Sequence, residues 1–324
     1  MKAAWYERQG PAGDVLTVGE MPDPHPSPGE VRIRIAASGI NPGDIKKRQN
    51  AFGYGMPYPR IVPHSDGAGQ VDEIGDGVSS QWLGEAVWCY GAQSYRPFGT
   101  AAEFTVVPVD QIARLPQPVS TDQGACLGIP GITAHRAVHV AGPVNGQTVL
   151  VQGAAGAVGL CAVQLARRAG ARVIGSLRSP SDEAIAIKAG AHEVVRNDEK
   201  LIDMLKALAP KGIDHIVEVA FGANVEADLE LLNTDGSIAT YATDNPNPKV
   251  PFWPMVFKNI RLYFLGSDDF PQEAKAAAAA DLNAALEAGW SGFEIGERVP
   301  LAEIVRAHEL AEHPAHRGRV IVIV

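Results

Sequence analysis

The segment 152–159, QGAAGAVG, has the residue types and spacing of a turn that can hold a phosphate group. An apolar stretch expected to be a strand precedes it, and residues 158–168, expected to be a helix, follow it. A pyrophosphate must approach the backbone closely, and a helix amino terminus offers free N–H groups and a positive dipole end. A Cβ atom at Gly156 would obstruct that approach, while Gly159 lets the helix lie close to the sheet. The pattern predicts dinucleotide binding, although Ala154 stands at the usual second glycine; the alternative is a tight turn without a ligand.

The end of the next strand, expected over residues 172–176, indicates which dinucleotide is bound. An NAD site usually places Asp or Glu there, about 20 residues after the turn, to hold the ribose 2′-OH. No carboxylate occupies that place in this chain. Arg178, with Ser176 and Ser179, could instead hold a 2′-phosphate through a charge-assisted bond that contributes about 1.5–3 kcal/mol. We therefore predict NADPH as the cofactor; the alternative interpretation of Arg178 is an ordinary exposed loop residue.

Strands that alternate with helices must position this turn in a parallel sheet. Six are expected, over residues 148–152, 172–176, 193–195, 215–219, 237–241 and 261–265. The first third of the chain instead has short strands separated by Gly and Pro, typical of a small barrel or partly open β fold. These are expected over residues 31–36, 67–75, 86–90 and 102–106. A helix is expected over 274–288, and the apolar run 319–324 must pair inside a sheet, so we expect it to rejoin the amino-terminal domain.

Composition excludes several classes of function. The 324 residues are 46% hydrophobic and 20% charged with a net charge of −9, as in a globular enzyme with an acidic surface. The densest basic run, residues 46–48, is too short to indicate nucleic-acid binding. No stretch is apolar over the ~18 residues that a membrane helix needs, and the amino terminus lacks a signal-peptide core. Three scattered cysteines suit a reducing compartment, so we expect a cytoplasmic protein without membrane contact.

Several segments taken together resemble the zinc-independent quinone oxidoreductases, the zeta-crystallin-like branch of the medium-chain dehydrogenase/reductases. Besides the glycine turn, they are residues 10–16, 38–44, 65–69, 128–134, 190–194 and 318–320. The resemblance implies an α/β protein with a Rossmann dinucleotide-binding domain (123–266) inserted into a GroES-like, mostly β catalytic domain (1–122 and 267–324). It also implies a cleft at the domain junction, a homodimer, and NADPH-dependent reduction of quinones or related conjugated carbonyls.

The resemblance also implies roles for individual residues. Asn41, Lys46 and Thr133 should line the nicotinamide end of the cofactor. The remaining cofactor-binding positions it implies are Ala155, Gly156, Ala157, Val158, Arg178, Asn197, Asn224, Tyr241, Ala242, Thr243, Phe264, Leu265 and Gly266. The chain departs from the family at Lys46 (often Tyr), His64 (usually Gly) and His135 (usually Tyr), which bears on the choice of acceptor.

Zinc-dependent relatives hold a catalytic metal with Cys, His and acidic ligands. In this chain Asn41 occupies the region of the Cys, the Gly-His-Glu segment reads His64-Ser65-Asp66, and no cluster of four cysteines exists for a structural zinc. We therefore expect no metal, and a catalytic role that consists of positioning cofactor and acceptor. Asn41, Lys46 and His64 are the candidate donors to the acceptor oxygen, although that oxygen can also take its proton from solvent.

The aromatic-rich segment 252–257 could form a wall for the substrate or, equally, a core or dimer contact. The sequence leaves three alternative functions open. They are an NADPH-dependent enone or alkenal reductase, a non-catalytic NADPH-binding protein, and a zinc alcohol dehydrogenase, which the absent ligands disfavour.

Overall fold

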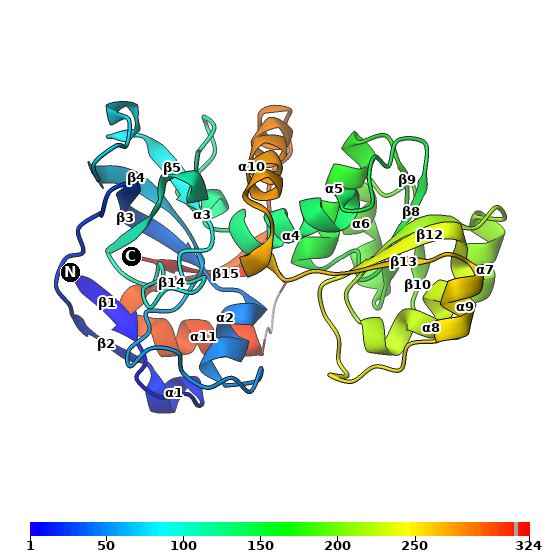
Figure 1. The fold of residues 1–324 in the computed structure, drawn as a ribbon, viewed down its shortest axis with the longest axis horizontal. Helices are drawn as coiled ribbons and strands as arrows, with labels where there is room; N and C mark the ends of the chain where they lie inside the picture. The colour runs from blue at the N-terminus through cyan, green and yellow to red at the C-terminus, as the bar shows by residue number, and fades with distance from the viewer. Residues whose placement is uncertain (314–316) are drawn as a thin grey trace. The chain divides into compact units, whose positions relative to one another are not determined.

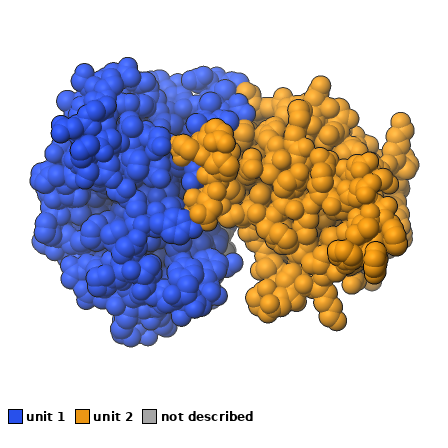
Figure 2. Space-filling view, in the orientation of Figure 1, with its two compact units in different colours: residues 1–130, 275–324 blue, residues 131–274 orange. Residues whose placement is uncertain are grey.

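The computed structural model describes residues 1–313 and 317–324, which form two compact units (Figures 1 and 2). Unit 1 comprises residues 1–130 and 275–324, and unit 2 comprises residues 131–274. The units divide inside two helices, α4 (Gly128–His139) and α10 (Gln272–Glu287). The domain boundaries expected from the sequence, 122/123 and 266/267, remain a prediction. Among the described residues, none of the helices combines the length and the apolar character that a membrane span requires.

Unit 2 is built on a six-stranded parallel sheet with the strand order β10-β9-β8-β11-β12-β13. The strands are β8 (Thr148–Val151), β9 (Arg172–Leu177), β10 (Glu193–Arg196), β11 (Ile213–Glu218), β12 (Leu232–Thr240) and β13 (Arg261–Phe264). All six lie where the alternating pattern predicts them. The order reverses between β8 and β11, and in open parallel sheets ligands bind at the carboxyl ends of the strands beside such a reversal.

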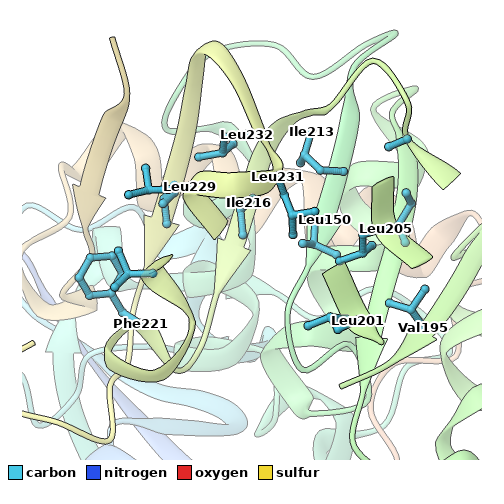
Figure 3. Packing of buried hydrophobic residues seen from close by; sticks show 14 of the residues in the cluster. Leu150, Val195, Leu201, Leu205, Ile213, Ile216, Phe221, Leu229, Leu231 and Leu232 are labelled. Carbon is cyan, nitrogen blue, oxygen red and sulfur yellow. The ribbon is translucent and has the colours of Figure 1, made fainter. Parts of the chain in front are cut away.

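Helices connect these strands and bury the sheet. They are α5 (Ala157–Arg168), α6 (Glu183–Ala189), α7 (Leu201–Leu208), α8 (Phe221–Leu231) and α9 (Phe252–Phe257). Helices α5 and α6 contact each other, as do α7 and α8. The main apolar core joins residues of neighbouring strands, such as Leu150 and Ile216, to Leu205 of α7 and to Phe221 and Leu229 of α8 (Figure 3). This packing fixes the ends of β8 and β11 relative to α8.

Unit 1 is mostly β and contains a seven-stranded sheet with the order β14-β15-β3-β4-β5-β7, in which β6 also pairs with β3. Its strands are β3 (Glu30–Gly39), β4 (Asp66–Ile74), β5 (Ala86–Cys89), β6 (Phe104–Pro108), β7 (Ile112–Arg114), β14 (Ile295–Pro300) and β15 (Arg319–Ile323); β1 (Lys2–Trp5) and β2 (Thr17–Glu20) form a separate pair. Strand β15 is antiparallel to β3, with Ile321 opposite Gly39. The prediction that the carboxyl-terminal run rejoins the amino-terminal domain is confirmed.

Short helices complete unit 1: α1 (Ala12–Val15), α2 (Pro42–Arg48), α3 (Thr121–Gly124) and α11 (Ile304–Glu312). Asn41 precedes α2 as its N-cap, and the Asp44 carboxylate accepts the Asn41 backbone N–H at 2.8 Å, as in a capping box. This cap places Asn41 at the end of β3, near the start of β4, where the polar cluster described below is built.

Candidate functional site

The turn between β8 and α5 has the geometry that a phosphate-binding turn requires. Gly153 has a left-handed φ of +66°, and a Cβ atom on Gly159 would lie 2.2 Å from the Gly153 carbonyl oxygen. Both positions therefore need glycine for the turn to close. Gly156 is different, because its φ of −75° suits any residue and its Cβ would meet only the Gly153 oxygen, at 3.4 Å. The fold itself does not demand glycine at position 156, so the open space beside it is available to a ligand.

Helix α5 begins directly at this turn, with Gly156 as its N-cap. No side chain caps the helix and no acidic residue lies in its first turn. By helix geometry, the N–H groups of Ala157 and Val158 have no partner inside the helix. These groups and the positive end of the helix dipole are therefore free to receive an anion.

The structure brings most of the predicted cofactor residues of unit 2 to the carboxyl ends of the strands. Four backbone hydrogen bonds link the segments that follow neighbouring strands. The N–H groups donate to carbonyl oxygens as follows: Asn197 to Leu177 at 2.6 Å, Tyr241 to Glu218 at 3.2 Å, Phe221 to Ala242 at 3.2 Å, and Leu265 to Thr240 at 2.9 Å. The Thr243 hydroxyl accepts the Gly222 N–H at 3.2 Å, and the Phe264 ring meets the Phe221 ring edge-on. Gly266 follows Leu265 at the same edge, whereas Thr133 is buried in α4.

Ser176 lies behind the glycine turn rather than at its open side. Its side chain is buried; its hydroxyl donates to the Gln152 side-chain oxygen and accepts the Gly153 N–H at 3.3 Å. The single hydroxyl hydrogen is thus used inside the protein and is not available to a 2′-phosphate. Arg178 and Asn197, just beyond the ends of β9 and β10, are exposed and remain in place for that role.

A pair of buried carboxyl groups, Glu218 and Asp228, lies next to this turn, and the sequence analysis did not identify it. Glu218 ends β11 and Asp228 is on α8; both are fully buried, and they share a hydrogen bond. Burial raises the pKa of both groups, and the Glu218 charge raises that of Asp228 further. Asn224, a predicted cofactor residue, donates its side-chain amide to both Glu218 oxygens at 3.1 and 3.2 Å.

In unit 1, Asn41 belongs to a buried polar cluster with Asp66 and Arg319. The Asn41 amide donates to the Asp66 carboxylate at 2.7 Å, and the Arg319 guanidinium donates to the Asn41 amide oxygen at 2.7 Å. The Ile129 backbone N–H also donates to Asp66, at 2.8 Å. Burial and the nearby Asp44 charge raise the pKa of Asp66 to about 7. Asp66 can therefore change its protonation state near neutral pH.

His64 lies in a second buried cluster of unit 1. Its Nδ1 is 2.8 Å from the Ser38 hydroxyl and its Nε2 is 3.0 Å from Nε2 of His308, while the Arg48 guanidinium donates to Nδ1 of His308 at 3.4 Å. Burial lowers the pKa of His64 to about 3, so the ring is neutral at physiological pH. Both ring nitrogens are engaged, which leaves His64 without a hydrogen to give to an acceptor.

Lys46, on α2, differs from the other two candidate donors because it is exposed. Its ammonium lies 6.0 Å from the centre of the Phe52 ring, which stacks on Tyr54, and both rings are more than half exposed. Among the three predicted catalytic residues, Lys46 is the one whose polar group faces outward.

Similarity to known proteins shows which family this chain belongs to. A model described as an alcohol dehydrogenase GroES-like domain matches residues 27–117, and one described as a zinc-binding dehydrogenase matches residues 157–279. The quinone oxidoreductase of Mus musculus is 34% identical over 311 residues, covering 93% of this chain and 91% of the relative. The chain belongs to the quinone oxidoreductase branch of the medium-chain dehydrogenase/reductase superfamily.

Other members of the branch give the same result. The human quinone oxidoreductase is 32% identical over 309 residues, or 93% of this chain and 91% of that protein. A mycobacterial quinone oxidoreductase matches with a TM-score of 0.88, and a mycobacterial protein complexed with NADPH with 0.86; each is 26% identical and aligned over the whole of both chains. The predicted fold class, a GroES-like domain combined with a Rossmann domain, is confirmed.

Several polar residues of these clusters are not marked as site residues by any pattern in the sequence, among them Asp66, Glu218, Asp228, His308 and Arg319. Asp66 and Arg319 lie inside segments that resemble the family, so the resemblance, rather than a pattern, carried a signal for their positions. His308 approaches His64 across 244 residues of sequence, and no spacing rule connects two such positions.

Proposed function

We propose that this member of the quinone oxidoreductase branch reduces quinones or related conjugated carbonyls with NADPH, by hydride transfer and without a metal. The observation that carries the proposal is the glycine turn: Gly153 and Gly159 are required to close it, whereas Gly156 leaves open space beside free N–H groups of α5. Such a turn suits a pyrophosphate. A relative of similar fold was solved as a complex with NADPH, and the mouse and human relatives are named quinone oxidoreductases.

The residues at the strand ends of unit 2 fit NADPH. Backbone N–H groups of Ala157 and Val158 would hold the pyrophosphate, and Arg178, exposed with no carboxylate at the end of β9, would hold the 2′-phosphate. When bound, NADPH would supply the hydride that reduces the acceptor. The protein would orient the cofactor and donate a hydrogen bond to the acceptor oxygen, and we assign that donor to Lys46 because its ammonium is exposed.

The polar cluster of unit 1 supports a reaction without zinc. Asn41 donates its amide to Asp66, and its amide oxygen accepts from the Arg319 guanidinium, so a positive charge already faces this group. A zinc ion at this position would be repelled by the positive charge of Arg319. Amide and guanidinium groups are also not the ligands that zinc prefers. We assign Asn41 and His64 to holding the local structure.

The cysteines Cys89, Cys126 and Cys161 are buried and form no disulfide, which supports a cytoplasmic location.

The test is steady-state oxidation of NADPH and of NADH by a panel of quinones, enones and alkenals, with the metal content of the purified protein measured in parallel. The proposal expects turnover with quinones, a preference for NADPH, and no stoichiometric zinc. Turnover with enones or alkenals alone would change the acceptor class. Binding of NADPH without turnover on any acceptor would instead support a non-catalytic NADPH-binding protein, and zinc at one equivalent would support an alcohol dehydrogenase.

We also propose a homodimer that uses the exposed aromatic residues of α9. Phe252, Trp253 and Phe257 are 64%, 63% and 77% exposed, and β13, with Phe264 67% exposed, is an edge strand of the unit 2 sheet. Apolar surface beside an unpaired strand edge is typical of an association surface. The segment 252–257 therefore suits a subunit contact better than a substrate wall.

A further inference from the structure

The glycine turn is connected to the buried carboxyl pair by a series of hydrogen bonds. The Gly153 N–H donates to the Ser176 hydroxyl at 3.3 Å, and Ser176 donates to the Gln152 side-chain oxygen. The Gln152 amide nitrogen donates to Asp228 Oδ1 at 3.0 Å. The series starts at the first glycine of the turn and ends on α8.

The direction of these bonds is determined by the donors. Ser176 already accepts the Gly153 N–H, so its own hydrogen goes to the Gln152 oxygen, and the Gln152 amide nitrogen must then point to Asp228. Asp228 Oδ1 therefore acts as an acceptor. Asp228 Oδ2 is buried and receives no donor from the described residues, while the Asp228 side chain shares a hydrogen bond with Glu218. A proton on Oδ2, donated to Glu218, satisfies every one of these contacts.

Glu218 is the better placed of the two groups to keep the negative charge. It accepts the Ala220 backbone N–H and the Asn224 side-chain amide, whereas Asp228 receives one donor, from Gln152. The pKa of Asp228 is raised well above its ordinary range, as a shared proton requires. Among the described residues, Tyr241 is a further ionisable group that interacts with Glu218; burial and the Glu218 charge raise the pKa of Tyr241, so it stays neutral.

We propose that protonated Asp228 and ionised Glu218 are positioning residues for the dinucleotide, because together they orient Gln152 and Ser176 behind the glycine turn and hold Asn224 beside it. The proposal rests on the proposed function, since it assumes that NADPH binds at this turn. With Asp228 protonated, each donor meets an acceptor. If that proton is lost, two adjacent carboxylates are buried as anions, and one of them must move and disturb Gln152 or Asn224.

Three variants separate this positioning role from a general loss of stability. Asp228→Asn keeps the hydrogen-bond pattern, because its amide nitrogen donates to Glu218 and its oxygen accepts from Gln152. Asp228→Ala removes both contacts. Leu229→Ala, the matched control, destabilises the same helix through the apolar core without touching the polar series (Figure 3).

The experiment measures the dissociation constant of NADPH by fluorescence titration at pH 7, and the melting temperature of each protein without ligand. We expect Asp228→Asn to bind within about twofold of the wild type, and Leu229→Ala to melt earlier but bind normally. Asp228→Ala should bind about tenfold or more weakly, because Gln152 and Glu218 each lose the hydrogen-bond partner that holds them in place.

Equal binding by Asp228→Ala and Leu229→Ala would overturn the proposal, as would Asp228→Asn binding as weakly as Asp228→Ala. If the wild type does not bind NADPH at all, the proposed function fails, and that outcome is distinct from these.

Discussion

Substitutions at two glycines of the same turn should affect different properties: one should abolish cofactor binding, and the other should lower the stability of the protein. Gly156→Val should leave the protein folded but unable to bind NADPH or NADH. Gly159→Ala should destabilise the protein before any ligand is added. The reason is the surroundings of each Cβ atom: at position 156 the nearest atom is the Gly153 oxygen at 3.4 Å, and at position 159 the same oxygen is at 2.2 Å.

The magnitudes follow from these contacts. Valine at the N-cap of α5 is less favourable than glycine by about 1 kcal/mol, so the free energy of unfolding should change little. The valine side chain would occupy the space needed by the pyrophosphate; the loss of two charge-assisted bonds of about 1.5–3 kcal/mol each corresponds to a roughly hundredfold or larger loss of affinity. Forcing a methyl group against a backbone carbonyl in Gly159→Ala should cost about 1–3 kcal/mol of stability.

Denaturant unfolding of both variants without ligand, followed by titration with NADPH and NADH, measures the two effects separately. The reasoning is refuted if folded Gly156→Val binds NADPH within about tenfold of the wild type, since the phosphates would then not lie against this turn. It is also refuted if Gly159→Ala is as stable as the wild type.

Three further predictions concern other parts of the molecule. Arg178→Glu should weaken NADPH at least tenfold more than NADH in binding titrations, and an equal loss for both would show that Arg178 does not contact the 2′-phosphate. Burial lowers the pKa of His64 from its ordinary value of 6.5 to about 3 in the folded protein, so the unfolded chain takes up a proton first as pH falls. The free energy of unfolding should therefore drop by about 2 kcal/mol from this group between pH 7 and pH 5, and a denaturant series on His64→Asn should lack that drop; parallel pH profiles would contradict it. Phe257→Asp should convert the proposed dimer into monomers in light scattering, and a wild type that is already monomeric, or a variant that stays dimeric, would remove the proposed role of α9.

Much of the fold could be predicted because its signals are local. The alternation of apolar strands and helices between residues 148 and 265 placed all six strands of the parallel sheet. The carboxyl-terminal run is too apolar to lie outside a sheet, which indicated its pairing in unit 1. Strand β14 (Ile295–Pro300) was missed because it alternates weakly and ends in proline, and helix α11 because its buried face depends on contacts with β14 and β15.

The site was predicted only where a local pattern marks it. The glycine turn can be recognised from eight consecutive residues, 152–159. The arrangement behind it does not, because Gln152, Ser176 and Asp228 come from three elements that adjoin only after the sheet has formed. The expected strands 215–219 and 237–241 leave Asp228 in the segment between them, and nothing in the sequence indicates that its buried side chain meets a second carboxyl group. Likewise, Ser176 was expected to face the 2′-phosphate, and only the fold shows that its hydroxyl is used inside.

The most direct measurement of the central claim is a crystal structure of the protein with NADPH bound. We predict the pyrophosphate within hydrogen-bonding distance of the backbone N–H groups at the start of α5, beside Gly156, and the 2′-phosphate in contact with Arg178. Cofactor density elsewhere, with this turn occupied by a side chain or by nothing under saturating NADPH, would contradict the account.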